Sequence, residues 1–290
     1  MGLGFAYSLY VIGKNTLIGR EIATSKLGSS SIGAFTTIVF IVSLIAGTIV
    51  GSKIGETSGW IPFGILAFLA LLILAAGVLS TADTRRERTE FVFSFDRYVK
   101  LFARYGIFMV GLGCFWQISV EASQVAINYS KEYFGKTNSE SALLLLFSSV
   151  GAILGNVLSV RLSKNRLPSF MWMTGVFIGI IFLFSTILGL AESMKAYVIV
   201  QMLAFSVGFF FGGAVNLSES HFYALLGGDA EKDHVSALYG FVLSLVGAVT
   251  MFASEKILHT GSYVGISVFL GLLAAMALYG GHRGLRMTGS

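Results

Sequence analysis

Long apolar stretches, separated by short charged connections, dominate this sequence of 290 residues. About eight of them run for about 18 residues or more, the length at which a helix crosses the hydrocarbon core of a membrane, and a ninth, partial stretch opens the chain. Only 12% of the residues are charged and the mean hydropathy is +0.80, which leaves too little polar surface for a water-soluble protein of this size. The sequence therefore predicts a protein that crosses the bilayer several times.

The apolar segments favour helices over a β-barrel. Strands of a membrane barrel alternate apolar and polar residues over about ten positions, whereas 65–79 and 176–190 are apolar nearly all round. Because each backbone polar group in lipid must bond within its own segment, the 35 glycines and 2 prolines suit closely packed helices. The predicted fold class is all-α, a polytopic membrane bundle with about nine transmembrane helices. We expect these helices at 2–18, 33–52, 59–80, 101–129, 141–162, 169–190, 196–217, 235–255 and 262–281.

The basic residues are divided unevenly between the alternating connections. If the 81–100 connection is cytoplasmic, all but five of the 20 basic residues lie on the cytoplasmic side, as the positive-inside rule requires. The five on the opposite side are Lys53, Lys131, Lys136, Lys195 and Lys256. This pattern predicts a multi-pass integral membrane protein with a cytoplasmic C-terminus. Since the charges form no basic face, no nucleic-acid partner is expected.

A short internal similarity relates two of the apolar segments. The residues from Phe40 to Gly47 resemble those from Phe241 to Ala248 in type and order. A chance match between apolar segments is one explanation; a parallel repeat of two six-helix halves is the other. On the second interpretation, the chain holds the last nine of twelve helices. The predicted domains are then a partial N-terminal bundle at 1–80, a cytoplasmic connecting loop at 81–100 and a C-terminal six-helix bundle at 101–290.

The best candidate for a functional site is a row of polar residues in the predicted helix at 101–129. Gln117, Glu121, Gln124 and Asn128 are spaced by four, three and four positions, which places them on one helical face, and Trp116 flanks the row. An ionisable group at membrane depth normally faces a cavity or a partner. Glu121 is therefore a candidate for proton coupling or for contact with a cationic head group. The alternative is a protonated glutamic acid that only hydrogen-bonds neighbouring helices.

Two further polar groups lie toward the predicted cytoplasmic ends of their helices. Two glycines four positions apart precede Asn156, and Arg161 opens the basic loop that follows. Another glycine-rich stretch precedes Asn216 and Glu219. One interpretation is a cytoplasmic gate that includes these four polar residues. The other is close helix packing followed by solvated helix ends and an anchoring basic loop.

The sequence carries no pattern typical of an enzyme. Its four histidines are scattered singly, and its single cysteine, Cys114, lies in an apolar stretch, so the sequence offers neither a zinc-ligand spacing nor an internal disulfide. Gly13-Lys14 lacks the serine or threonine that a phosphate loop requires. We therefore expect no catalytic residue, no metal and no cofactor, and no primary active transport by this chain alone.

Several of these residues resemble the major facilitator superfamily. The stretch from Phe115-Trp116-Gln117 onward is similar to the seventh helix of that family, and the glycine-rich helix before Arg161-Leu-Ser-Lys164 is similar to its eighth. Asn216-Leu217 resembles the end of the family's tenth-helix pattern, with Val215 in place of the usual proline. Within the superfamily, the likeness is to bacterial lysophospholipid transporters and to the transporter halves of acyltransferase fusions.

The resemblance implies a rocker-type secondary transporter whose substrate path lies between two six-helix halves, with Glu121 and its row facing the substrate. The implied substrate is an amphipathic lipid such as a lysophospholipid, and the implied location is the bacterial inner membrane. Two alternatives stay open. The same fold could exchange a small drug-like or metabolite solute for protons, or the chain could be a non-transporting membrane partner of an acyltransferase. The expected partners are therefore membrane lipids and a lipid or small-molecule substrate. Under the last alternative, the partner is an acyltransferase.

Overall fold

The computed structural model describes residues 94–162, 194–225, 229–260 and 263–287, together with isolated positions elsewhere. This part of the chain is all-α, as predicted. The predicted helices at 2–18, 33–52, 59–80 and 169–190, and most of the 81–100 connection, lie outside the described residues. The helices within them are α4 (Phe95–Phe134), α5 (Asn138–Ser159), α7 (Met194–Leu225), α8 (Asp229–His259) and α9 (Tyr263–Arg286).

Three helices of the described part are long and apolar enough to cross a membrane. Their apolar stretches are Phe95–Ala122 in α4, Tyr197–Phe222 in α7 and His234–His259 in α8, and α5 carries a shorter one at Leu143–Ser159. Large apolar side chains are also exposed on the outside of these helices, for example Phe241, Val249 and Phe252 on α8. Lipid chains cover such a surface without cost, whereas water does not.

α4 is longer than the sequence predicts at both ends. It begins at Phe95, which places residues 95–100 in the helix rather than in the predicted connecting loop. Asp96 in its first turn stabilises this start, because it lies at the positive end of the helix dipole and pairs with Lys100 at 2.7 Å. The helix ends where Gly135 adopts a φ of 59°, a left-handed conformation that glycine tolerates because it has no Cβ.

The limits of the other helices differ from the predicted ones by one to eight residues. α5 begins at Asn138 because Thr137 caps it: the Thr137 hydroxyl accepts the Glu140 N–H at 3.2 Å, and the Glu140 carboxylate accepts the Thr137 N–H at 2.9 Å. This capping box gives partners to amide groups that the helix itself cannot satisfy. α5 ends at Ser159, which leaves Arg161 in the following turn. α7 and α8 continue as helix beyond their apolar stretches, because polarity alone does not end a helix.

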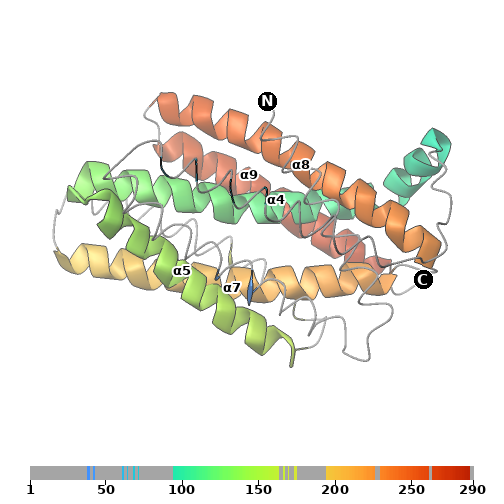
Figure 1. Ribbon diagram of the computed structural model, residues 1–290, viewed down its shortest axis with the longest axis horizontal. Helices are drawn as coiled ribbons and strands as arrows, with labels where there is room; N and C mark the ends of the chain where they lie inside the picture. Colours follow the sequence, from blue (N-terminus) through green and yellow to red (C-terminus); the bar gives the residue numbers. More distant parts are fainter. Residues whose placement is uncertain are drawn as a thin grey trace.

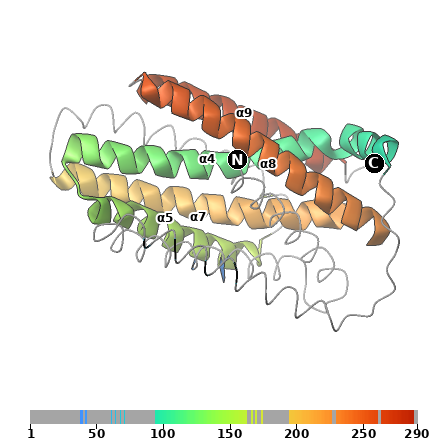
Figure 2. The ribbon, with the colours of Figure 1, turned by 45° about the horizontal axis from the view of Figure 1, so that its top comes forward.

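α4 lies between two pairs of helices, with α8 and α9 on one side and α5 and α7 on the other (Figure 1, Figure 2). α4 and α8 run parallel. The Tyr98 hydroxyl lies 3.1 Å from Nδ1 of His234 near the start of both helices, and Gly113 faces Val246 further along. The parallel course matters for the site, because residues at similar distances from the two helix starts become neighbours.

Glycines set the closest approaches between helices. A Cβ added at Gly280 of α9 would lie 2.6 Å from the Cα of Gly111 on α4. On the other side of α4, a Cβ at Gly155 of α5 would overlap the carbonyl oxygen of Phe209 on α7. Any side chain at these positions would push the two helices apart, so glycine is required for the observed spacing.

Two buried apolar clusters hold α4 in place. One cluster joins α4 to α7 and α9, and within it Phe115 stacks on Phe211 with ring centres 5.1 Å apart. The other joins the first half of α4 to α7 and α8, where Phe108 and Tyr239 both pack against Phe222. Buried aromatic pairs of this kind contribute stability beyond their apolar area. They fix the rotation of α4 about its axis and hence the direction of its polar side chains.

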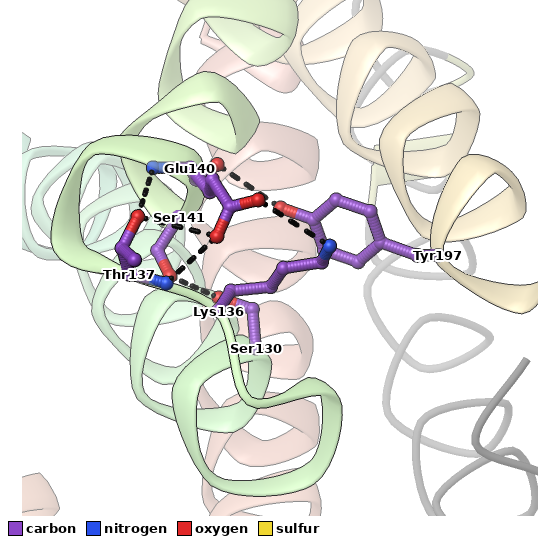
Figure 3. Close-up of polar contacts among 6 residues, drawn as sticks. All are labelled: Ser130, Lys136, Thr137, Glu140, Ser141 and Tyr197. Carbon is purple, nitrogen blue, oxygen red and sulfur yellow. Dashed lines mark hydrogen bonds and ion pairs between the residues drawn. The ribbon is translucent and has the colours of Figure 1, made fainter. Parts of the chain in front are cut away.

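The short connection between α4 and α5 is tied to the start of α7 (Figure 3). The Tyr197 hydroxyl donates to the Glu140 carbonyl oxygen at 3.1 Å. The Lys136 ammonium lies 5.0 Å from the centre of the Tyr197 ring and 3.5 Å from the Glu140 carboxylate. Across the turn, the Ser130 hydroxyl donates to Ser141 at 2.7 Å. These contacts hold the ends of three helices together at one end of the bundle.

Candidate functional site

Glu121 lies on the face of α4 that meets α8, and its side chain is 0% exposed. Neither of its carboxylate oxygens has a hydrogen-bond partner among the residues that the structure describes. Ser254 of α8 is a polar neighbour of the carboxyl group, but the Ser254 hydroxyl donates to the Met251 carbonyl oxygen at 3.1 Å. A carboxyl group in such a place needs a proton, a cation or a polar ligand to offset its burial.

Gln117 lies one turn before Glu121 and also faces α8. A Cβ added at Gly247 would lie 2.8 Å from the Gln117 amide nitrogen, so this amide lies directly against the α8 backbone. The Gln117 amide oxygen is buried and has no hydrogen-bond partner in the described part of the chain. Two neighbouring turns of α4 therefore present unsatisfied oxygen atoms at the boundary with α8.

α8 meets these residues with a polar stripe that the sequence reasoning missed. Gly247, Thr250 and Ser254 are spaced by three and four positions, which places them on one helical face, and all three are buried. The Thr250 hydroxyl donates to the Val246 carbonyl oxygen at 2.9 Å. The Ser254 hydroxyl likewise donates to a carbonyl oxygen of α8, that of Met251. Small and hydroxyl-bearing residues at this spacing in an apolar segment are the signal that would have identified the stripe.

The remainder of the predicted row lies in different surroundings. Asn128 is exposed, because α4 continues past its parallel neighbour: α8 has Ser254 beside Glu121 and ends at His259. The side chain of Gln124 lies outside the described ones. All four residues lie in α4, but Glu121 is buried and Asn128 is exposed, so the members of the row do not share one environment.

Trp116 connects α4 to α7 rather than to α8. Its ring lies edge-on to Phe211, with ring centres 5.6 Å apart, and it packs against the apolar cluster between α4, α7 and α9. The structure thus separates the predicted site into Gln117 and Glu121 at α8 and Trp116 at α7.

Two of the four predicted gate residues meet between α5 and α7. The Asn216 amide nitrogen donates to the Ser159 hydroxyl at 2.6 Å, and that hydroxyl donates in turn to the backbone carbonyl oxygen of Asn156 at 2.7 Å. All three residues are fully buried. Ser159 was not predicted as part of this group. Its position three residues after Asn156 places both side chains on the same face of α5. Arg161 is exposed in the turn after α5, and Glu219 is half-buried one turn beyond Asn216.

The glycine-rich stretches of α5 and α7 pack against each other. A Cβ at Gly151 or Gly155 would overlap the backbone of α7, and a Cβ at Gly208 or Gly212 would overlap the backbone of α5. Each helix therefore contributes two glycines four residues apart to the same contact. The close helix packing predicted for the first pair is confirmed.

A scan against protein-family models finds no match for this chain, and a search of the curated proteins finds none either. Within the described part, no group of three or more His, Cys, Asp or Glu side chains could hold a metal ion. The described part of the chain is all-α and holds three helices able to cross a membrane, which indicates a multi-pass membrane protein. Any narrower assignment rests on the residues of the sequence and on the chemistry around Glu121.

Proposed function

We propose that the protein is a secondary transporter of the major facilitator type that moves an amphipathic, lysophospholipid-like substrate by alternating access in a bacterial inner membrane, with its C-terminus in the cytoplasm. The observation that carries this proposal is the fully buried carboxyl group of Glu121, which lies on a helix able to span a membrane. Its oxygen atoms have no hydrogen-bond partner among the described residues. Ionisable groups at such positions mark substrate or ion pathways in membrane proteins. A lipid with an amine in its head group supplies the opposite charge.

The neighbours of Glu121 suit a polar head group. The Gln117 amide oxygen is available as an acceptor, and the hydroxyls of Thr250 and Ser254 donate to carbonyl oxygens of their own helix. A hydroxyl can rotate from such a bond toward a ligand, because it acts as both donor and acceptor. The apolar side chains exposed on α8 offer a surface for the acyl chain.

A second candidate function, proton-coupled export of a small solute, is favoured by the lack of a hydrogen-bond partner for the Glu121 carboxylate oxygens among the described residues. A proton offsets the burial of a carboxyl group as well as a cationic substrate does. In this case Glu121 carries the coupling proton, and the solute binds elsewhere on the path. The third candidate, a membrane partner of an acyltransferase, requires no transport at all.

Transport of a labelled lipid by the full chain distinguishes these functions. The purified protein is reconstituted into liposomes that carry a fluorescent lysophosphatidylethanolamine in the outer leaflet, and albumin extraction measures how much remains there. We expect the wild-type protein to make the lipid inaccessible to albumin, and Glu121→Gln to abolish this movement while eluting as the same monodisperse species. Glu255→Gln is the matched control, because Glu255 is an exposed carboxylate next to Ser254, and it should transport normally.

Each alternative has its own outcome in the same preparation. Solute uptake driven by a proton gradient, without lipid movement, supports the second function. Co-purification with an acyltransferase, and no transport of lipid or solute, supports the third. If the Glu121→Gln variant transports at the rate of the wild type, Glu121 has no role in either lipid transport or proton-coupled export.

A further inference from the structure

We propose that a buried polar cluster between α5 and α7 binds a sodium ion. The cluster consists of Asn156 and Ser159 of α5 and of Asn216 and Ser220 of α7, and we call it the α5–α7 cluster. It is separate from the Glu121 site, which lies between α4 and α8. The proposal does not depend on which substrate the protein transports.

The first argument is the burial of oxygen atoms without partners. Asn156 and Asn216 are 0% exposed and Ser220 is 6% exposed. The amide oxygens of both asparagines and the Ser220 hydroxyl oxygen have no hydrogen-bond partner among the residues that the structure describes. Buried polar atoms are nearly always satisfied in folded proteins, so these three oxygens call for a bound ion or a buried water molecule as a partner.

The second argument is the connection between these residues. The Asn216 amide nitrogen, the Ser159 hydroxyl and the Asn156 carbonyl oxygen are joined by hydrogen bonds of 2.6 and 2.7 Å. Asn156, Ser159 and Asn216 therefore form one hydrogen-bonded group where the last turn of α5 meets α7. Ser220, four residues after Asn216, lies one turn further along the same face of α7.

The Asn156 side chain lies at the same contact between the helices. Its amide nitrogen donates to the Ala152 carbonyl oxygen at 2.9 Å. That carbonyl oxygen faces α7, because a Cβ added at Gly212 would overlap it. Gly212 is one turn before Asn216, so the Asn156 amide lies beside the turn of α7 that carries Asn216.

The end of α5 adds electrostatic attraction for a cation. α5 ends at Ser159, and the N–H of Val160 bonds to Leu158 rather than continuing the helical pattern to Asn156. The last carbonyl groups of a helix carry the negative end of its dipole, which attracts a cation. Glu219, half-buried one turn beyond Asn216, adds a carboxylate to this end of α7, whereas Arg161 is exposed.

The chemistry of the cluster selects a small monovalent cation. Amide oxygens only accept hydrogen bonds, so the ligand must be a donor or a positive ion. Hard cations prefer oxygen ligands such as amide and carbonyl groups. Because the side chains of the cluster are neutral, a monovalent ion fits better than a divalent one, which needs carboxylate ligands to offset its charge. A buried water molecule is the competing occupant.

Thermal unfolding of the full chain in detergent tests the proposal. Tryptophan fluorescence follows unfolding in increasing NaCl, with choline chloride keeping the ionic strength constant. A ligand that binds only the folded state raises the unfolding midpoint as its concentration rises, so we expect a saturable rise with sodium and a smaller one with potassium. Equilibrium binding of radioactive sodium to the same protein should saturate over the same concentration range.

Two variants and one control locate the site. Asn216→Leu should abolish the response to sodium, and Ser220→Ala, which removes one oxygen from the cluster, should shift the titration to higher sodium concentrations. Ser206→Ala is the control, because the Ser206 hydroxyl donates to its own helix at Met202 (3.0 Å), and its titration should match the wild type. If Asn216→Leu fails to fold, Ser220→Ala decides the question.

Two results would overturn the sodium site. A wild-type midpoint that does not respond to sodium is the behaviour expected for a buried water molecule. A sodium response that is the same in Ser220→Ala as in Ser206→Ala would place the ion elsewhere in the protein.

Discussion

Replacing Gly155 by alanine tests whether α5 and α7 lie as close together as the structure shows. The new Cβ would overlap the Phe209 carbonyl oxygen, and it would lie 2.8 Å from the Phe209 carbonyl carbon and 3.0 Å from the Gly213 nitrogen. These atoms belong to the backbone of α7, so they cannot rotate away as a side chain would. The two helices must therefore move apart.

The expected loss of stability follows from two contributions. Inserting a methyl group into a filled contact costs about 1–3 kcal/mol, and the rigid neighbours place Gly155→Ala in the upper part of that range. Separating the helices also weakens the hydrogen bond of 2.6 Å between Asn216 and Ser159, worth about 1 kcal/mol. Alanine recovers about 1 kcal/mol through its higher helix propensity. The free energy of unfolding should fall by about 2–3 kcal/mol in total.

Unfolding in mixed detergent and dodecyl sulfate micelles, followed by circular dichroism, measures this change. Gly271→Ala is the matched control on α9, because a Cβ at Gly271 would meet nothing within 4 Å, and it should be neutral or up to about 1 kcal/mol more stable. The reasoning is refuted if Gly155→Ala unfolds at the same denaturant concentration as Gly271→Ala.

Three further predictions concern the contacts at the start of α5. Tyr197→Phe removes the hydrogen bond to the Glu140 carbonyl oxygen and should lower the free energy of unfolding in the same micelles by about 1 kcal/mol; an unchanged value would contradict this bond. Thr137→Ala removes the cap of α5 and should cost about 1 kcal/mol, with faster hydrogen exchange confined to the first turn of that helix; unchanged exchange there would count against the cap. The pKa of Glu140 is lowered mainly by the hydrogen bond from the Thr137 N–H, and further by the Thr137 hydroxyl and by Lys136. The Glu140 carboxylate therefore stabilises the fold at pH values above the ordinary glutamate pKa. This contribution disappears as the pH falls through the lowered pKa. The stability difference between the wild type and Glu140→Gln should therefore vanish in acid, and a difference that persists there would show another cause.

The helices could be predicted from the sequence because the membrane sets their minimum apolar length. Each described helix contains most of a predicted one, and its limits differ from the predicted limits by one to eight residues. Their ends could not be predicted from apolarity, since polar contacts contribute to them: the Thr137 capping box marks the start of α5, and the exposed Asp96 pairs with Lys100 in the first turn of α4. Such contacts are small in free energy and appear only when the backbone is in place.

The candidate site could be predicted only on the helix that carries it. Regular spacing identified Gln117 and Glu121, because helical periodicity is local. Ser254 was missed, since its role depends on the pairing of α4 with α8, and a serine bonded to its own helix resembles many others in an apolar segment. The different surroundings of Glu121 and Asn128 could not be predicted, because the sequence does not show where the neighbouring helix ends.

Accessibility of position 121 to a water-soluble reagent tests the central claim most directly. Cys114 is the single cysteine of the chain, so Glu121→Cys in a Cys114→Ala background carries one thiol, and Asn128→Cys, at an exposed position, is the positive control. A transporter must open position 121 to water during its cycle, so a charged methanethiosulfonate reagent should modify the thiol. A thiol at 121 that stays unmodified while the one at 128 reacts fully would contradict a role of Glu121 in a transport pathway.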